Sequence, residues 1–132
     1  MTEKLFHKDI TERILQSFFT VNKTLQYELS AVIYGNALAI EFEPNNLTAT
    51  RNYSSELRYH DVKIGSLQAD FLIEKKVFVK VVSTESIDKG IIEDIKLLLQ
   101  TSGYEICMIL NLLGDNEYKR IIFSNEYKRK RL

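Results

Sequence analysis

The sequence is poor in the side chains from which structural metal sites are built. It has one cysteine and two histidines, His7 and His60, among 132 residues, and it has no tryptophan and a single proline. This small set excludes a structural zinc site within one chain, because such a site needs four thiolate or imidazole ligands. Cys107 lies in the apolar run 106–110, where we expect a buried and unreactive thiol.

Other absences exclude whole classes of function. The glycines are scattered at positions 35, 65, 90, 103 and 114, so the chain has no glycine-rich phosphate loop. No nucleophile, histidine and acid combine into a recognisable hydrolase triad. No window approaches eighteen apolar residues, and the first eight residues mix both charge signs without an apolar stretch. We therefore expect a cytoplasmic protein without a membrane partner.

The overall composition is that of a folded protein with an uneven charge distribution. Apolar residues make up 45% of the chain and charged residues 27%. The length predicts a single domain over residues 1–132. The formal net charge is zero, but between residues 119 and 132 six basic side chains stand against Glu126 alone. The sequence therefore predicts a basic C-terminal tail at about 124–132.

Apolar periodicity in the first two thirds of the chain predicts two helices followed by three strands. Spacings of three and four residues predict helices over 9–25 and 28–42. Between 48 and 82 the period changes to two, which predicts short antiparallel strands joined by turns at 60–61 and 74–76.

The last third predicts a further helix and two more strands. Ser86 or Asp88 is placed to cap a helix that ends at 102, because both side chains accept hydrogen bonds from a helix N-terminus. Strands are then expected over 104–111 and 120–123. The expected fold class is α/β, of the α+β type.

Four segments carry a resemblance to a known family. They are 34–42 (YGNALAIEF), 65–73 (GSLQADFLI), 108–112 (MILNL) and 119–122 (KRII), and the spacing between them matches as well. The chain thus resembles the small bacterial GxxExxR proteins of the PD-(D/E)XK nuclease superfamily over nearly its whole length. The resemblance implies a core of N-terminal helices, a three-stranded antiparallel meander, a helix and further strands in a mixed sheet.

The catalytic positions of that family are changed in this sequence. The resemblance aligns the family's aspartate with Asp70, its Glu-x-Lys pair with Lys80 and Val82, and its signature glutamate with Ala31. In the family, two carboxylates hold Mg²⁺, which lowers the pKa of the attacking water, while the lysine stabilises developing charge. One aspartate cannot do this alone. The resemblance therefore implies a vestigial site with no bound metal and no cofactor.

We further expect Asp70 and Lys80 to form an ion pair that replaces the metal. Alternation along a strand puts Phe78, Lys80 and Val82 on one face, and Val82 then covers the pair.

The leading hypothesis is a catalytically inactive domain that acts by binding nucleic acid. The basic tail and the former substrate cleft are the candidate surface, because basic side chains with interleaved aromatics contact phosphates and stack on bases. The predicted contact residues are Lys119, Arg120, Tyr127, Lys128, Arg129, Lys130 and Arg131.

Two alternatives stay open. Phe18, Phe19 and residues 97–99 exceed what we expect one small core to bury, which favours a protein-interaction module or a homo-oligomer. The other alternative is a Mg²⁺-dependent nuclease whose acidic ligands are rearranged to Glu41, Asp70 and Asp94.

Overall fold

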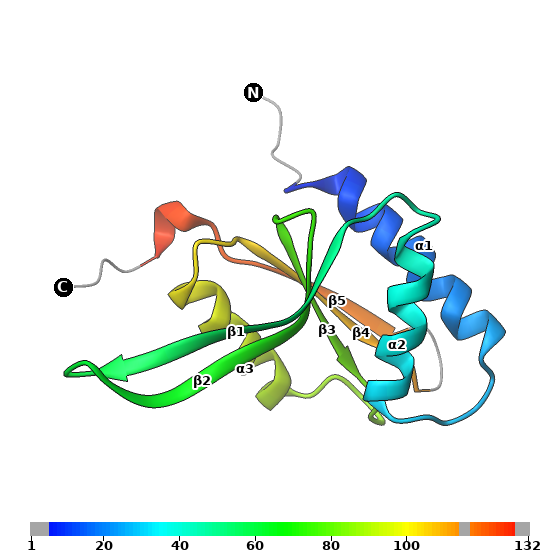
Figure 1. The fold of residues 1–132 in the computed structure, drawn as a ribbon. Helices are drawn as coiled ribbons and strands as arrows, with labels where there is room; N and C mark the ends of the chain where they lie inside the picture. Colours follow the sequence, from blue (N-terminus) through cyan, green and yellow to red (C-terminus); the bar gives the residue numbers. More distant parts are fainter. Residues whose placement is uncertain (1–5, 114–116, 129–132) are drawn as a thin grey trace.

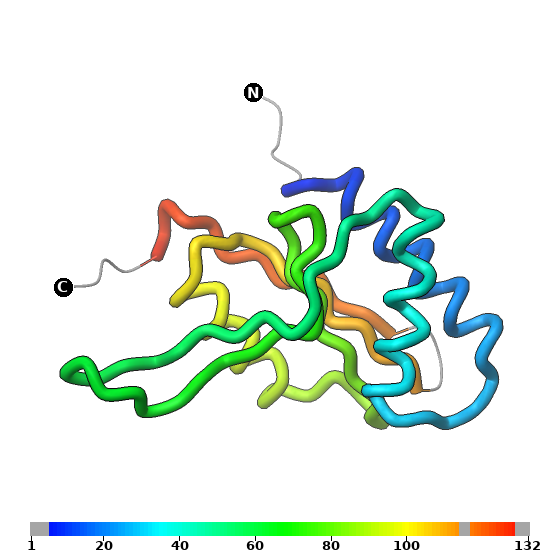
Figure 2. The backbone as a smooth tube through the Cα atoms, in the orientation of Figure 1, coloured from blue at the N-terminus to red at the C-terminus, as the bar shows by residue number. Residues whose placement is uncertain are grey.

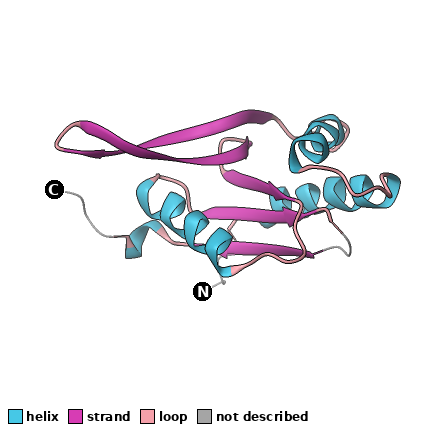
Figure 3. Cartoon of the chain, turned by 90° about the horizontal axis from the view of Figure 1, so that it is seen from below, coloured by secondary structure: helices cyan, strands magenta, loops and turns pink. Residues whose placement is uncertain are grey.

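A mixed β-sheet with helices on both faces forms the framework of the protein. The computed structural model describes residues 6–113 and 117–128. Helices α1 (Lys8–Thr24) and α2 (Ala31–Phe42) cover one face of the sheet, and α3 (Lys89–Thr101) covers the other (Figure 1; Figure 3). The predicted α+β fold class is confirmed.

The sheet contains the predicted antiparallel meander and a parallel extension of it. Its strands lie in the order β1-β2-β3-β4-β5, and only β3 and β4 run parallel to each other among the strands described. Helix α3 provides the crossover that this parallel pair requires. The strands are β1 (Ala49–Tyr59), β2 (Val62–Ile73), β3 (Val77–Val82), β4 (Ile106–Asn111) and β5 (Glu117–Ile122), and a 3₁₀ turn, η1 (Asn125–Tyr127), follows them.

Hydrogen bonds of capping residues correct the predicted start of α2 and decide that of α3. Ser30 caps α2 by accepting a hydrogen bond from the Ile33 N–H, so this helix begins at residue 31 and not at 28. Of the two predicted caps of α3, Asp88 is the one that accepts from the Ile91 N–H, at 2.9 Å.

The last strand begins three residues before its predicted start because of Glu117. This residue pairs with Asn111 of β4, and its carboxylate accepts the N–H of Ile87 at 3.1 Å and the amide of Asn111 at 2.9 Å. Asn111 is fully buried and also bonds both backbone groups of Thr84. These contacts fix the loop that leads into α3.

Strands β1 and β2 are longer than predicted and extend beyond the sheet as an arm, residues 53–69. The arm turns at His60 and Asp61, whose φ angles of 50° and 63° suit a two-residue hairpin of the primed type. Strand β2 pairs with β3 only at residues 71–73, whereas its pairing with β1 runs to the tip. Figure 2 shows the arm reaching past the end of β3.

The side-chain alternation of β1 and β2 inverts where the arm begins. In the part of β1 and β2 outside the arm, odd-numbered residues face α1 and α2. Phe71 lies in the core beneath these helices, and the Arg51 guanidinium lies 5.2 Å from the centre of the Phe71 ring. Within the arm, Tyr53 and Ala69 pack in the core beneath α3. Asn52 lies between, with a left-handed φ of 60° in the middle of the strand. Asparagine tolerates this conformation better than most residues, and the kink turns the arm over.

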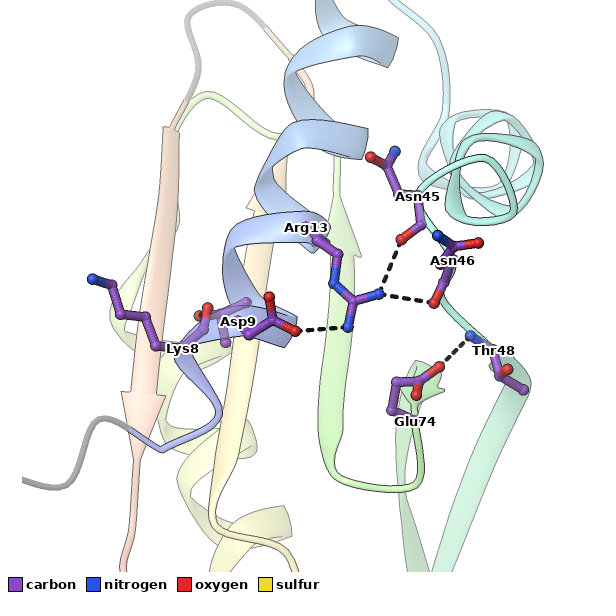
Figure 4. Close-up of polar contacts among 8 residues, drawn as sticks. Lys8, Asp9, Arg13, Asn45, Asn46, Thr48 and Glu74 are labelled. Carbon is purple, nitrogen blue, oxygen red and sulfur yellow. Dashed lines mark hydrogen bonds and ion pairs between the residues drawn. The ribbon is translucent and has the colours of Figure 1, made fainter.

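Polar contacts hold the N-terminal helices against the sheet (Figure 4). The Arg13 guanidinium of α1 donates to the carbonyl oxygens of Asn45 and Asn46, at 3.1 and 2.9 Å. The carboxylate of Glu74 accepts the N–H of Thr48 at 2.6 Å. The loop that connects α2 to β1 is therefore held by α1 at residues 45 and 46 and by the β2–β3 turn at Thr48.

The predicted excess of apolar side chains holds for two of the five residues named and fails for three. Phe18, Leu98 and Leu99 are buried in the two cores, whereas Phe19 and Leu97 are exposed, at 40% and 38%. In the part of the chain that the structure describes, no helix has the length and apolar character needed to cross a bilayer.

Candidate functional site

Strand β3 presents Lys80 toward α3. Val77, Val79 and Val81 pack in the core beneath α1 and α2, whereas Phe78 and Val82 pack beneath α3. This is the alternation predicted from the sequence. Lys80 therefore points to the α3 side, where it is half-buried, and Val82 beside it is only 7% exposed.

Asp70 lies where β2 separates from β3. The pairing of β2 with β3 covers residues 71–73 of β2 and ends at the pair Phe71 and Val79. Asp70, the residue that precedes Phe71, therefore lies just outside the paired region. The Asp70 carboxylate then accepts the N–H of the buried Val81 at 2.6 Å. A side-chain oxygen thus satisfies a strand N–H that the main chain of β2 no longer reaches.

The predicted ion pair between Asp70 and Lys80 is wrong. In residues 6–113 and 117–128, the ion pairs within 4.0 Å are Lys8–Glu12, Arg13–Asp9, Arg58–Glu56 and Lys89–Glu93. The Asp70 carboxylate is turned to the Val81 N–H instead, and a backbone donor there needs no counter-charge. The Lys80 ammonium has neither a hydrogen bond nor an ion pair with any described residue.

Lys80 lies between two adjoining pockets, which we call the Lys80 pockets. One, of about 240 Å³, lies at the start of the arm and includes Asn52, Asp70 and Gln68 in its lining. The other, of about 330 Å³, lies against α3 and includes Asp94 and again Gln68. Lys80 and Gln68 line both. Of the predicted vestigial residues, Asp70 and Lys80 therefore come together, whereas Val82 lines neither pocket; Asp94, a candidate ligand of the nuclease alternative, lies on the other side of Lys80.

The structure does not bring Glu41 to this place. Glu41 belongs to α2, on the opposite face of the sheet from α3 and Asp94 (Figure 3). Within the described ranges, no three His, Cys, Asp or Glu side chains gather closely enough to hold a metal ion. The predicted three-acid cluster is therefore absent from the described structure.

Cys107 lies beneath the Lys80 pockets and is inaccessible. It pairs with Phe78 across the β3–β4 ladder and is 0% exposed. Burial raises the pKa of its thiol far above the ordinary value; the positive charge of Lys80 lowers it and the negative charge of Asp70 raises it, both by less. The predicted buried thiol is confirmed.

A comparison with protein families identifies this architecture. The profile of the PD-(D/E)XK nuclease superfamily matches residues 8–121, which span all three helices and nearly the whole sheet. The chain belongs to the PD-(D/E)XK nuclease superfamily. Comparisons with curated proteins and with solved structures gave no match.

The divalent cation that PD-(D/E)XK nucleases use does not fit the residues of the Lys80 pockets. A hard cation requires several oxygen ligands, and the Asp70 carboxylate already accepts a strand N–H. The ammonium of Lys80 stands between Asp70 and Asp94 and repels a cation from the space they share.

The basic residues predicted to contact nucleic acid lie on different faces of this PD-(D/E)XK domain. Lys119 and Arg120 are neighbours on β5 and therefore point to opposite sides of the sheet. Arg120 donates to the hydroxyl of Thr11 on α1, at 3.0 Å. The next residue, Ile121, packs against the core beneath α3, so Lys119 is on the side of the Lys80 pockets.

The first residues of the predicted tail, 124–128, are anchored to the chain that follows α3, and we call them the anchored segment. The Lys128 ammonium donates to the carbonyl oxygens of Ser102 and Tyr104, at 3.0 and 2.6 Å, just after the end of α3. Burial lowers the pKa of Lys128, and the negative charge of Glu105 partly opposes this shift. Tyr127 is 74% exposed, while Arg129, Lys130 and Arg131 lie outside the described residues.

Sequence reasoning missed Asn52 and Gln68 as site residues. The sequence pattern of β1 and β2 marks neither residue as special. The available signal was that asparagine is one of the few residues that accept a positive φ, which occurs here at the point of strand inversion. Gln68 becomes a site residue only because the arm turns over next to it.

Proposed function

We propose that this PD-(D/E)XK domain binds nucleic acid and does not cleave it, as a GxxExxR-like protein with degenerate catalytic motifs. The observation that carries the proposal is Lys80. Where a metal-binding carboxylate would stand in a nuclease, the half-buried Lys80 side chain lines both pockets, and its ammonium has no partner among the described residues. An unpaired ammonium attracts an anion, and the anionic group that nucleic acid offers is the phosphate.

Polar side chains around Lys80 support a phosphate as the ligand. The amides of Gln68 and Asn52 and the hydroxyl of Ser54 line the pocket on the arm side, and all three groups donate hydrogen bonds. Lysine binds phosphate as a point charge, so neutral donors beside it fix the orientation. The charge reversal thus lets the site take the phosphate directly, without a bridging cation.

The anchored segment extends the same surface. Tyr53 lines the arm-side pocket, and its ring lies 6.0 Å from that of Tyr104. The carbonyl oxygen of Tyr104 accepts the Lys128 ammonium. Lys128, where the basic sequence 128–131 begins, is therefore separated from the pocket lining only by Tyr104. This closeness supports contact of one nucleic-acid strand with both the pocket and the basic sequence.

A binding assay with a matched lysine control tests the proposal. Fluorescence anisotropy with labelled single- and double-stranded DNA and RNA should show binding that weakens as salt rises. Lys80→Met should weaken this binding and reduce the salt slope by about one, because one phosphate contact is lost. Lys75→Met, on the exposed hairpin turn between β2 and β3, should change neither. Equal effects of the two substitutions would contradict a phosphate contact at Lys80.

A calorimetric titration tests the loss of cleavage. Mg²⁺ and Mn²⁺ should give no heat with the wild-type protein at millimolar concentration, and no DNA or RNA should be cut. The double variant Lys80→Glu, Val82→Lys restores the residues of the nuclease motif beside Asp70, and it should bind Mn²⁺. Metal binding and cleavage by the wild-type protein would overturn the proposal in favour of a true nuclease.

A further inference from the structure

The most exposed apolar helix surface of the protein lies on α2. Val32 and Ile40 are each 71% exposed on this helix, and Ile33 is 48% exposed. The opposite side of α2 packs on the core through Tyr34, Leu38 and Phe42. The helix is therefore apolar on all sides, with Asn36 and Glu41 as its only polar positions besides the Tyr34 hydroxyl. Such a helix is normally covered on all sides.

We propose that this face of α2 binds the same face of a second copy of this chain, in an antiparallel dimer with its two-fold axis at Asn36. Val32 and Ile40 stand four residues before and after Asn36, on one ridge of the helix. In antiparallel packing about that axis, Val32 meets Ile40 of the second copy, and Ile40 meets Val32. Ile33 likewise meets the small, half-buried Ala39. The pattern is self-complementary, as a two-fold interface requires.

The central polar residue favours a copy of this chain over an unrelated apolar partner. The exposed Asn36 stands between two β-branched apolar residues, so a purely apolar partner would bury its amide without a hydrogen bond. On a two-fold axis the same amide from the second copy lies opposite, and each supplies the donor and the acceptor that the other needs. A single buried asparagine is also a known means of fixing the register of paired helices.

Charges at the two ends of α2 complement each other in the same arrangement. The first turn of the helix has no acidic residue, although a helix N-terminus attracts negative charge. Glu43, exposed at the C-terminal end, lies seven residues after Asn36. Antiparallel packing therefore brings it to the N-terminus of α2 in the second copy. The two symmetry-related contacts of this kind favour the antiparallel orientation.

The sequence around α2 argues against nucleic acid or an anionic membrane as the occupant. No lysine or arginine occurs between Lys23 and Arg51. Phosphate backbones and anionic lipids are both bound through basic side chains. The dimer surface is thus separate from the Lys80 pockets, which face α3 on the other side of the sheet (Figure 1).

Sedimentation equilibrium over a range of protein concentrations tests the dimer. Wild-type protein should associate to a dimer that persists at high salt, because the contact is mainly apolar. Ile40→Glu should raise the dissociation constant at least about tenfold, since it places a carboxylate against Val32 of the second copy. Ile64→Glu is a matched control: Ile64 is 66% exposed but lies on the arm, and its substitution should leave the dissociation constant unchanged.

A cysteine cross-link tests the position of the axis. The native Cys107 is buried, so it does not interfere. Asn36→Cys places identical thiols next to each other on the axis, and oxidation should give a covalent dimer. Val32→Cys places the two thiols about 12 Å apart along the helices, which is too far for a disulfide. This variant should stay uncross-linked.

Three outcomes would overturn the proposal. A wild-type protein that stays monomeric throughout the concentration range would remove it. A dimer broken by Ile64→Glu but not by Ile40→Glu would place the interface on the arm. Cross-linking of Val32→Cys but not of Asn36→Cys would refute the two-fold axis at Asn36, whatever the stability of the variants.

Discussion

Asp70 is the residue whose role the structure changes most. The resemblance predicted it as a vestigial metal ligand, but its carboxylate completes the hydrogen bonding of β3 through the N–H of Val81. The fold therefore uses a side-chain hydrogen-bond acceptor at this position, where β2 turns away from β3. The retention of Asp70 without a second carboxylate has a structural reason that is independent of catalysis.

This role predicts a graded effect on stability. Asp70→Ala should reduce the free energy of unfolding by about 1–3 kcal/mol, because it leaves the buried Val81 N–H without an acceptor. Asp70→Asn keeps an acceptor oxygen and should cost less. Urea unfolding of both variants measures the difference, with Asp94→Ala, an exposed position, as a near-neutral control. Equal stability of Asp70→Ala and the wild type would show that Val81 finds another acceptor.

At the scale of elements, the strands show how far sequence patterns reach. Alternation correctly placed Phe78, Lys80 and Val82 on one face of β3, because β3 is regular and each of its faces lies on an apolar core. The same rule fails on β1 and β2, since the left-handed Asn52 reverses the faces halfway along. The predicted ion pair of Asp70 and Lys80 failed for a related reason: the pattern gave their strands but not the amide at Val81.

The end of α3 gives a prediction about protonation. The ammonium of Lys128 is partly buried against the carbonyl oxygens of Ser102 and Tyr104, and this burial lowers its pKa. Glu105→Gln should lower the pKa further, because it removes the negative charge that opposes the shift. Nuclear magnetic resonance titration of the Lys128 side chain measures both values. A Lys128 pKa at or above that of an ordinary lysine would contradict the contact.

The sign of the linked stability follows from the same shift. The folded state holds the Lys128 proton less tightly than the unfolded state does. Titration of this group should therefore raise the free energy of unfolding as pH rises from the folded pKa to the unfolded one. The comparison of wild type with Lys128→Met isolates this contribution from those of the other lysines.

For the molecule as a whole, the two cores and the arm should differ in local stability. All six residues of β4 are buried, and β4 is bonded on both sides, by β3 and β5. Neither edge of the arm pairs with a further described strand, and Tyr59, Val62 and Ile64 near its tip are more than 60% exposed. Hydrogen exchange should therefore be slowest in β4 and fastest in the outer arm. An arm protected as strongly as β4 would mean that another molecule covers it.

The anchoring of α3 has a consequence for the order in which the protein is completed. Glu117 and Asn111 fix the loop before this helix, and Lys128 holds the chain just after its end. All three of these anchoring residues come later in the chain than the helix, and synthesis proceeds from the N-terminus. The meander and the N-terminal helices can thus assemble on the ribosome while α3 is still untethered. The wall that α3 contributes to the Lys80 pockets is therefore fixed only after residues 117–128 have emerged, later than the meander that forms the opposite wall.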